Sequence, residues 1–443
     1  MISGLMVKML DPMMDDAVIK MMQDDYPDNP FVMVTILEKL TARAIMEAGI
    51  RAELGTELQR PIGSPVVLSP WEKILLNPKQ LFQLPTPDVN QINTQTIIGK
   101  NAKKPLVLDI PIMITGMSLG GSLSFQLKEA LAKGSAMAGT STNTGESAVT
   151  EEERSNARYL IGQYNRGGWL SSHEQLQQLD AIEVQLGQGA FGGAVESPMK
   201  SEQIGKRLRA AWNVEEGEDA TVYSRHPDVN STNDIINLIN NLKETYEVPV
   251  GVKIAGTDYI EHELEVIAQT NADFITIDGA EGGTAVAPPT LEDDVGLPTL
   301  HSLVRVVDWL IENNMRDKFS LIIAGGLKTP GHFLKAMAIG ADAVYIGSIA
   351  VMATLQTQMT KTLPQSPPLQ MAMYTGKLKD KLDIDEAAHH LFNFLKSCIA
   401  EMKLAVQAVS KSAINELDRS DLVTVDKELA EFISIRYAAS RRK

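Results

Sequence analysis

Two glycine corners late in the chain are the first feature that could do chemistry. Gly325 and Gly326 follow one short apolar run, and Gly347 and Ser348 follow the next. Glycine lacks a Cβ atom, so a ligand can approach its backbone N–H groups, and a helix that begins near Pro330 adds its positive end. The two corners predict a phosphate cradle, the arrangement that (β/α)8 barrels place after their last two strands. The alternative is that these glycines serve only to form turns and helix ends and bind no ligand.

Lys253 is a second candidate, because it stands near the end of an otherwise apolar run. A buried lysine needs a partner or a ligand. Beside a bound flavin, such a cation would stabilise the anionic reduced ring and raise its reduction potential. The alternative is a structural ion pair with a carboxylate at the end of a strand, such as Asp278.

Four residues in other loops could face the same ligand. Gln188 can donate to and accept from a heteroaromatic edge, and Met117 with Ser118 could lie against a flat ring. Glu146 is a carboxylate in a small, neutral loop, where it could orient an amino or imino group or simply be solvated. We take Lys253, Glu146 and Gln188 as the catalytic candidates.

Short apolar runs alternate with helical patterns from residue 106 onwards. A run without polar alternation is typical of a strand buried on both faces of a parallel sheet. We expect strands at Ile112–Thr115, Ala181–Leu186, Val248–Ile254, Phe274–Asp278, Leu321–Ala324 and Ala343–Ile346. Helices are expected at about 124–137, 259–269, 299–314 and from Pro330. The segments 139–147 and 351–383 are interpreted as loops.

This alternation favours an α/β (β/α)8 TIM barrel. Every polar or glycine-rich loop comes after the carboxyl end of a strand, where such barrels carry their sites. An open doubly wound sheet competes, but no G-x-G-x-x-G follows the first strand. We expect an N-terminal helical and irregular appendage (1–95), with a helical part broken at Pro30. The barrel (96–383) and a C-terminal helical extension that packs on it (384–443) follow.

The composition bounds the class of protein. Hydrophobic residues make up 44% and charged residues 22% of the 443 positions, as in globular proteins with a sizeable core. The net charge of −15 disfavours nucleic acid and anionic membranes as partners. The single cysteine, Cys398, and the scattered histidines, such as His226 and His301, suit neither a metal site nor a hydrolytic triad. A single cysteine excludes a disulfide framework and fits a reducing cytosol, so we expect a cytoplasmic protein. No apolar run is long enough to predict a transmembrane helix.

The chain resembles the flavin-binding synthase domain of glutamate synthase and the stand-alone proteins built from it. The similarity extends from about residue 95 to 425, with its motifs in the same order. These motifs are Thr115-Gly116-Met117-Ser118 with Gly120, Asn143-Thr144-Gly145-Glu146, Gln188-Gly189-Ala190, Val252-Lys253, Asp278-Gly279-x-x-Gly282-Gly283-Thr284 with Pro288, Gly325-Gly326-Leu327-Lys328-Thr329 and Gly347-Ser348.

The resemblance implies a barrel that binds FMN. Its cofactor-binding positions would be Met117, Ser118, Gln188, Lys253, Gly282, Gly283, Thr284, Gly325, Gly326, Gly347 and Ser348. In that family, reduced FMN passes a hydride to the imine formed from 2-oxoglutarate and ammonia, which gives glutamate.

Three departures from the family pattern limit this transfer. Residues 351–373 contain no cysteine, so we expect no iron–sulfur cluster. The amidotransferase domain that supplies ammonia from glutamine is missing from this sequence. Phe191 stands where the family has a lysine for a substrate carboxylate. Losing that charge-assisted contact removes about 1.5–3 kcal/mol of binding free energy. The affinity for a dicarboxylate would then fall by about one to two orders of magnitude.

The sequence therefore predicts an FMN-dependent oxidoreductase of the glutamate synthase-like group. It would transfer a hydride between flavin and a carbon–nitrogen bond of a small, amino-acid-like substrate. Electrons would come from a separate reductase or a diffusible donor, and we expect a homo-oligomer. The alternatives are an isomerase or lyase that acts on a phosphorylated substrate, and a flavin-binding subunit that is active only within a complex.

Overall fold

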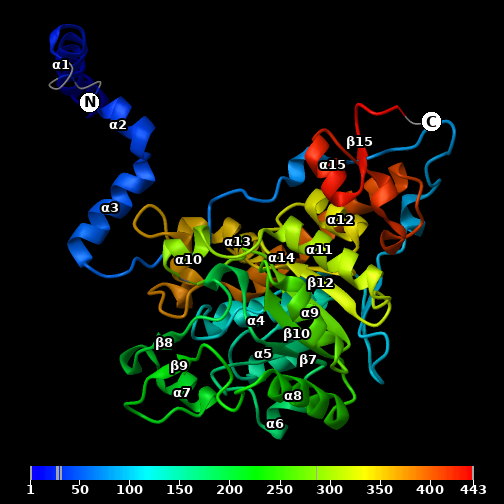
Figure 1. The fold of residues 1–443 in the computed structure, drawn as a ribbon. Helices are drawn as coiled ribbons and strands as arrows, with labels where there is room; N and C mark the ends of the chain where they lie inside the picture. The colour runs from blue at the N-terminus through cyan, green and yellow to red at the C-terminus, as the bar shows by residue number, and fades with distance from the viewer. Residues whose placement is uncertain (1, 26–28, 30–31, 286, 442–443) are drawn as a thin grey trace. The chain divides into compact units, whose positions relative to one another are not determined.

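A computed structural model describes residues 2–25, 29, 32–285 and 287–441. The chain forms two compact units, Met1–Gln59 and Arg60–Lys443. Figure 1 shows the course of the chain through both. The domain boundaries expected near residues 95 and 383 remain a prediction.

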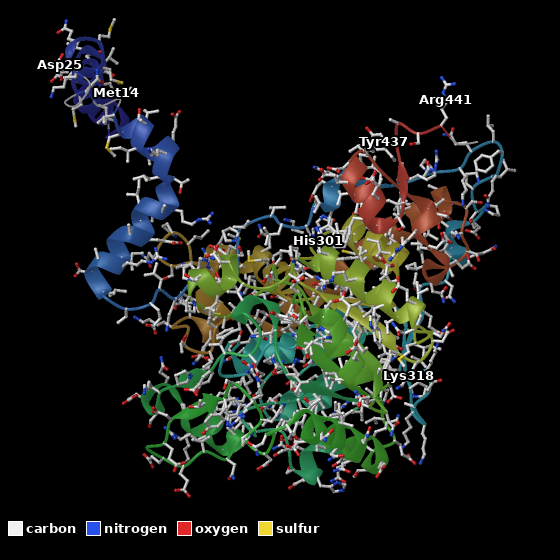
Figure 2. All side chains as sticks on the ribbon, viewed as in Figure 1. Met14, Asp25, His301, Lys318, Tyr437 and Arg441 are labelled. Atoms are coloured by element: carbon white, nitrogen blue, oxygen red, sulfur yellow. The ribbon has the colours of Figure 1, made fainter. Side chains whose placement is uncertain are left out.

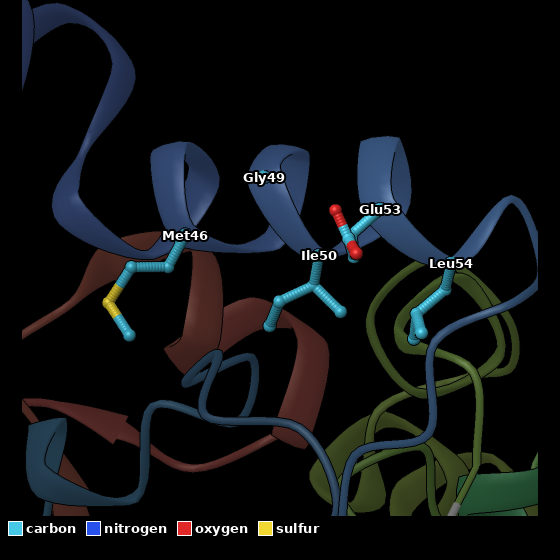
Figure 3. A pocket seen from close by; sticks show the side chains of 5 residues that line it. All are labelled: Met46, Gly49, Ile50, Glu53 and Leu54. Atoms are coloured by element: carbon cyan, nitrogen blue, oxygen red, sulfur yellow. The ribbon is translucent and has the colours of Figure 1, made fainter.

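The first unit consists of three helices, α1 (Ile2–Gln23), α2 (Val32–Leu40) and α3 (Ala42–Leu54). Helices are what the sequence predicts here, whereas the break expected at Pro30 lies outside the described residues. Neither α2 nor α3 contains a buried residue. On α3, Met46, Ile50 and Leu54 share one face at four-residue spacing, where they line a shallow apolar hollow (Figure 3).

The second unit is built on eight parallel strands, which confirms the predicted TIM barrel. The strands are β4 (Ile112–Ile114), β5 (Ser141–Asn143), β6 (Tyr159–Tyr164), β7 (Ala181–Gln185), β10 (Val250–Ala255), β11 (Phe274–Asp278), β12 (Ser320–Ala324) and β13 (Ala343–Ile346). Their hydrogen-bonded order is β4-β13-β12-β11-β10-β7-β6-β5. The ring therefore has one seam, between β4 and β5, which contact each other without a ladder.

A helix follows each barrel strand and covers the outside of the ring (Figure 1). These helices are α4 (Phe125–Met137), α5 (Glu151–Asn156), α6 (His173–Leu176), α8 (Thr232–Thr245), α9 (Ile260–Ala268), α11 (Thr299–Glu312), α12 (Pro330–Ile339) and α13 (Ser348–Leu355). Side-chain caps fix several of their starts: the Ser124 hydroxyl accepts from the Leu127 N–H and the Thr329 hydroxyl from the His332 N–H. The path from β7 to α8 also carries β8 (Ser197–Met199), α7 (Lys206–Trp212) and β9 (Ala220–Val222).

The strands alternate between two separate apolar clusters. Residues such as Ile275 and Ile277 pack outward against the helices, whereas Phe274 belongs to an inner cluster with Met113 and Ile322. This alternation follows from the two-residue period of a strand. Along β11, the inward positions after Phe274 are Thr276 and Asp278, so the barrel interior becomes polar toward the carboxyl ends.

A hairpin closes the amino-terminal end of the barrel. Strands β2 (Thr96–Ile98) and β3 (Leu106–Leu108) pair antiparallel, and Ile98, Leu106 and Leu108 pack into the inner cluster. The hairpin is bonded to strand starts, because the Ser320 hydroxyl accepts from the Gly99 N–H and the Val107 carbonyl accepts from the Tyr159 hydroxyl. No periodic signal marks this hairpin in the sequence.

Three sequence expectations for secondary structure need correction. The segment 139–147 is not all loop, because its small polar residues form β5. Segment 351–383 begins inside α13, which continues to Leu355 before short 3-10 turns. The C-terminal part is not helical throughout: after α14 (Ile384–Ala408), α15 (Lys427–Ile433) stands between strands β14 (Leu422–Thr424) and β15 (Arg436–Tyr437).

The C-terminal elements pack on the same unit. β14 pairs with β1 (Ile74–Leu76) and β15. His301 of α11 stacks on Phe432 of α15 with 5.1 Å between ring centroids, and Figure 2 labels His301. α14 lies so close to α4 that a Cβ atom on Gly134 would come within 2.9 Å of Leu391. Among the described residues, no helix has the length and apolar character needed to cross a membrane.

We expect Leu391→Ala to destabilise the barrel unit by about 2–5 kcal/mol, since it leaves a cavity between α14 and α4. Leu391 is fully buried. The same change at Leu404 of α14, which is 58% exposed, provides the control, with an expected effect within about 0.5 kcal/mol. Urea unfolding followed by circular dichroism measures both. Equal midpoint shifts for the two variants would contradict the packing described here.

Candidate functional site

The candidate residues all lie after the carboxyl ends of barrel strands or at those ends. Met117 and Ser118 follow β4, Glu146 follows β5, and Gln188 follows β7. Lys253 is in β10 itself, and the glycine corners follow β12 and β13. Because the strands are parallel, these positions share one rim of the barrel.

The two glycine corners are neighbours, because β12 pairs directly with β13. Gly325 and Gly326 have φ angles of 117° and 66°, which L-residues rarely adopt. Gly326 is exposed, and Gly347 and Ser348 are half-buried. Their backbone at the rim is therefore accessible to a ligand, with the start of α13 at Ser348.

Loops from other strands border these corners. A Cβ atom on Gly283, after β11, would clash with the Ser348 hydroxyl. A Cβ atom on Gly347 would lie 3.8 Å from the Met117 sulfur. The glycine-rich loop is held by Glu281, whose Oε2 accepts from both the N–H and the hydroxyl of Thr299 at 2.7 Å. Segments that follow β4, β11 and β13 thus meet at one place.

Lys253 is buried among carboxylates. Its Nζ lies 3.3 Å from Asp278 Oδ2, and its side chain is 2% exposed. Burial lowers the pKa of Lys253, but Asp278, Glu183 and Glu146 together outweigh that effect and raise it. The lysine is therefore an ammonium ion. The ion pair with Asp278, which the sequence suggested as an alternative, is present, and Lys253 also interacts electrostatically with Glu146.

Glu146 pairs with an arginine that the sequence analysis did not single out. Arg166 Nη2 lies 3.3 Å from Glu146 Oε1, and the two side chains are 2% and 14% exposed. Burial raises the pKa of Glu146, although Arg166 and Lys253 oppose this effect. Arg166 is itself fixed, because Nε donates to Gln185 Oε1 and Nη1 to the Tyr223 carbonyl.

A buried polar layer supports these charges from inside the barrel. Glu183 of β7 is fully buried. Its Oε1 accepts from the side-chain amides of Gln163 at 2.8 Å and Asn143 at 3.2 Å, and its Oε2 from the Thr276 hydroxyl at 2.7 Å. Four strands therefore share one carboxylate, which contributes to the electrostatic environment of Lys253.

Gln188 and Phe191 lie in a turn after β7. The backbone N–H and carbonyl of Gln188 bond to Gly193, and its half-buried side chain has no hydrogen bond to any other described residue. Phe191 ends the 3-10 turn Gly189–Phe191 and is half-buried. Gly189 packs so tightly on the Gly279 carbonyl that a Cβ atom would clash. The turn is thus anchored to the loop after β11.

The sequence analysis missed Arg166 and Glu183 for different reasons. Arg166 follows β6, which contains Gly162 and Gln163 and therefore lacks an uninterrupted apolar run. Glu183 stands in a predicted strand, and a carboxylate between Ala181 and Gln185 on the inward face is the signal that could have found it. In the described part of the chain, no cluster of histidine, cysteine or acidic residues has the geometry of a metal site.

Comparison with known proteins identifies the family to which this chain belongs. A family profile described as the conserved region in glutamate synthase matches residues 73–412. The chain belongs to the glutamate synthase family. A glutamate synthase large subunit-like protein of Rhizobium meliloti is 32% identical over 368 residues, which cover 79% of this chain and 82% of that protein. An archaeal glutamate synthase [NADPH] of Methanocaldococcus jannaschii is 31% identical over 390 residues, 85% of this chain and 75% of the relative.

Solved structures share the fold of this glutamate synthase family member at low sequence identity. A mutant flavocytochrome b2 with pyruvate bound is 15% identical, with a TM-score of 0.51, and the match covers 86% of this chain and 84% of that chain. A mutant of an active chimera of (S)-mandelate dehydrogenase is 14% identical, with a TM-score of 0.50 and coverage of 80% and 88%. Both similarities support the barrel architecture.

We expect His226 to make the protein less stable in acid. Its Nε2 lies 3.0 Å from the Gln185 carbonyl oxygen, and burial lowers its pKa from 6.5 to about 4. Between these values the unfolded chain binds the proton and the folded chain does not, so stability falls as the pH falls. The full effect is about 3 kcal/mol. Urea midpoints at pH 7 and pH 4.5 should therefore differ less in His226→Gln than in the native chain.

The matched control is His262→Gln, at an exposed position on α9. It should leave the difference between the two pH values unchanged. If His226→Gln also leaves it unchanged, the buried neutral imidazole is not a source of the acid sensitivity.

Proposed function

We propose that this chain is an FMN-dependent oxidoreductase that exchanges a hydride at a carbon–nitrogen bond of a small, amino-acid-like compound. The observation that carries the proposal is the pair of neighbouring glycine corners, with Met117 beside Gly347. A Cβ atom would come within 2.8 Å of Glu281 at Gly326 and within 2.9 Å of Thr115 at Gly347. Glycine backbone at two adjacent strand ends, exposed at Gly326 and half-buried at Gly347, suits a phosphate ester.

The residues at the rim would hold the cofactor in a defined way. Gly325, Gly326, Gly347 and Ser348 would bind the phosphate, with the loop of Gly282, Gly283 and Thr284 beside them. Met117 and Ser118 would support the ring, and Gln188 would bind a ring edge or the substrate. FMN, when bound, supplies hydride chemistry at N5 of its ring.

The buried charges suit the chemistry proposed for this site. Lys253 remains an ammonium ion and would stabilise negative charge on the reduced ring. Glu146, whose pKa is raised by burial, would orient a substrate nitrogen and exchange a proton with it. Arg166 holds that carboxylate in place. Among the relatives, the Methanocaldococcus jannaschii protein carries NADPH in its name, so we propose NADPH, directly or through a reductase, as the electron donor.

Anaerobic half-reactions of the purified protein test this function. We expect a flavin absorption band that bleaches on reduction and returns when a 2-oxo acid is added together with ammonia or a small amine. A screen of such pairs would also identify the substrate. A colourless protein that takes up no FMN, or a reduced flavin that none of these pairs reoxidises, would overturn the proposal.

A variant at the proposed proton-exchanging residue makes this test specific. Glu146→Gln should slow reoxidation about 10²–10⁴-fold. Glu129→Gln, on the half-exposed surface of α4, is the control and should leave the rate unchanged.

The loop after β7 generates a separate prediction on substrate choice. Phe191→Lys would restore a cation for a substrate carboxylate and should strengthen 2-oxoglutarate binding about ten- to a hundredfold. Calorimetric titration measures the affinity. The same substitution at Phe82, which is 76% exposed, is the control. Identical affinities in all three proteins would mean that residue 191 does not face the substrate.

A further inference from the structure

The seam between β4 and β5 lies directly beneath two of the proposed functional residues. Met117 follows β4, and Glu146 follows β5. No ladder joins these two strands, so backbone pairing does not set the distance between their loops. At the amino-terminal end a side chain bridges the seam, because the Thr140 hydroxyl donates to the Ile112 carbonyl at 2.7 Å.

At the carboxyl-terminal end, Lys128 bridges the same seam. Its Nζ donates to the Met117 carbonyl at 3.0 Å and to the Asn143 carbonyl at 2.6 Å. The third partner is Glu153 of α5, whose Oε1 lies 2.8 Å away. Two carbonyls therefore accept hydrogen bonds from the ammonium ion, and one carboxylate forms an ion pair with it.

The position of Lys128 in its helix explains this reach. It is in the first turn of α4, and helical side chains point back toward the N-terminus of their helix, here toward the loop after β4. The side chains of Lys128 and Glu153 are only 3% and 1% exposed. Burying an ion pair so deeply requires good geometry, and removing one partner leaves an uncompensated charge.

The loops that Lys128 connects are also in tight contact. A Cβ atom on Gly145 would clash with the backbone of Met117 and Ser118. Gly145 immediately precedes Glu146, and its N–H donates to Asn143 Oδ1 at 2.9 Å. A displacement of either carbonyl held by Lys128 would therefore change how Met117 and Glu146 lie relative to each other.

We propose that Lys128 is a positioning residue that closes the β4–β5 seam and thereby sets the spacing between the Met117 ring support and Glu146. Glu153 acts with it by holding the ammonium ion over the seam. This inference rests on the proposed function for what the two loops bind, but the seam itself can be tested without any ligand.

Hydrogen exchange of the ligand-free protein is the first test. In Lys128→Met, the amides of residues 116–121 and 144–147 should exchange at least tenfold faster relative to those of residues 275–277 in β11. Lys133→Met is the matched control, because Lys133 is on the same helix and pairs with Glu129 and Asp385 at the surface. An equal acceleration at all sites, or none, would overturn the positioning role.

FMN titration is the second test. Losing a charged hydrogen bond to the Met117 loop should weaken FMN binding about tenfold or more, and visible circular dichroism of saturated protein should change. The double variant Lys128→Met/Glu153→Gln leaves no lone buried charge and should show the same loss if the single variant does not fold. Unchanged affinity and spectrum in folded variants would refute this inference alone. Failure of the native chain to bind FMN would refute the proposed function. Hydrogen exchange would still show whether Lys128 holds the β4–β5 seam closed.

Discussion

The arrangement of the rim depends on one buried ammonium ion, that of Lys253. A lysine at 2% exposure remains charged only if carboxylates surround it, and Asp278, Glu183 and Glu146 meet that requirement. Glu183 must in turn be satisfied inside the barrel, which explains the amide and hydroxyl groups that β5, β6 and β11 direct inward. One cation thus specifies polar residues on several strands of an otherwise apolar ring.

The helices outside the ring serve this rim as well as the core. The first residue of α11, Thr299, donates its N–H and its hydroxyl to Glu281 and so fixes the glycine-rich loop beside the corners. α4 sends Lys128 back across the seam. The Lys128 contacts hold together two strands that no ladder joins. The Glu281 contacts cap α11, because Pro298 before this helix makes no side-chain cap.

The sequence predicts the part of this protein that depends on local apolar pattern. Runs such as Phe274–Asp278 and Ala343–Ile346 have the predicted strand bounds. β5, by contrast, consists of Ser141, Thr142 and Asn143, and only its neighbours in space make it a strand. Arg166 could not be connected with Glu146 because that contact crosses two loops of unpredicted length. The Lys253–Asp278 pair was foreseeable, since both residues end adjacent apolar runs.

The hairpin of β2 and β3 affects access to the interior of the barrel. Ile98, Leu106 and Leu108 fill its amino-terminal end with apolar side chains, whereas the polar side chains of the interior lie toward the opposite mouth. Under the proposed function, the electron donor and the electron acceptor would then share one entrance at the carboxyl-terminal rim. The first product would leave before the second reactant binds, an order that steady-state kinetics would show as parallel double-reciprocal lines.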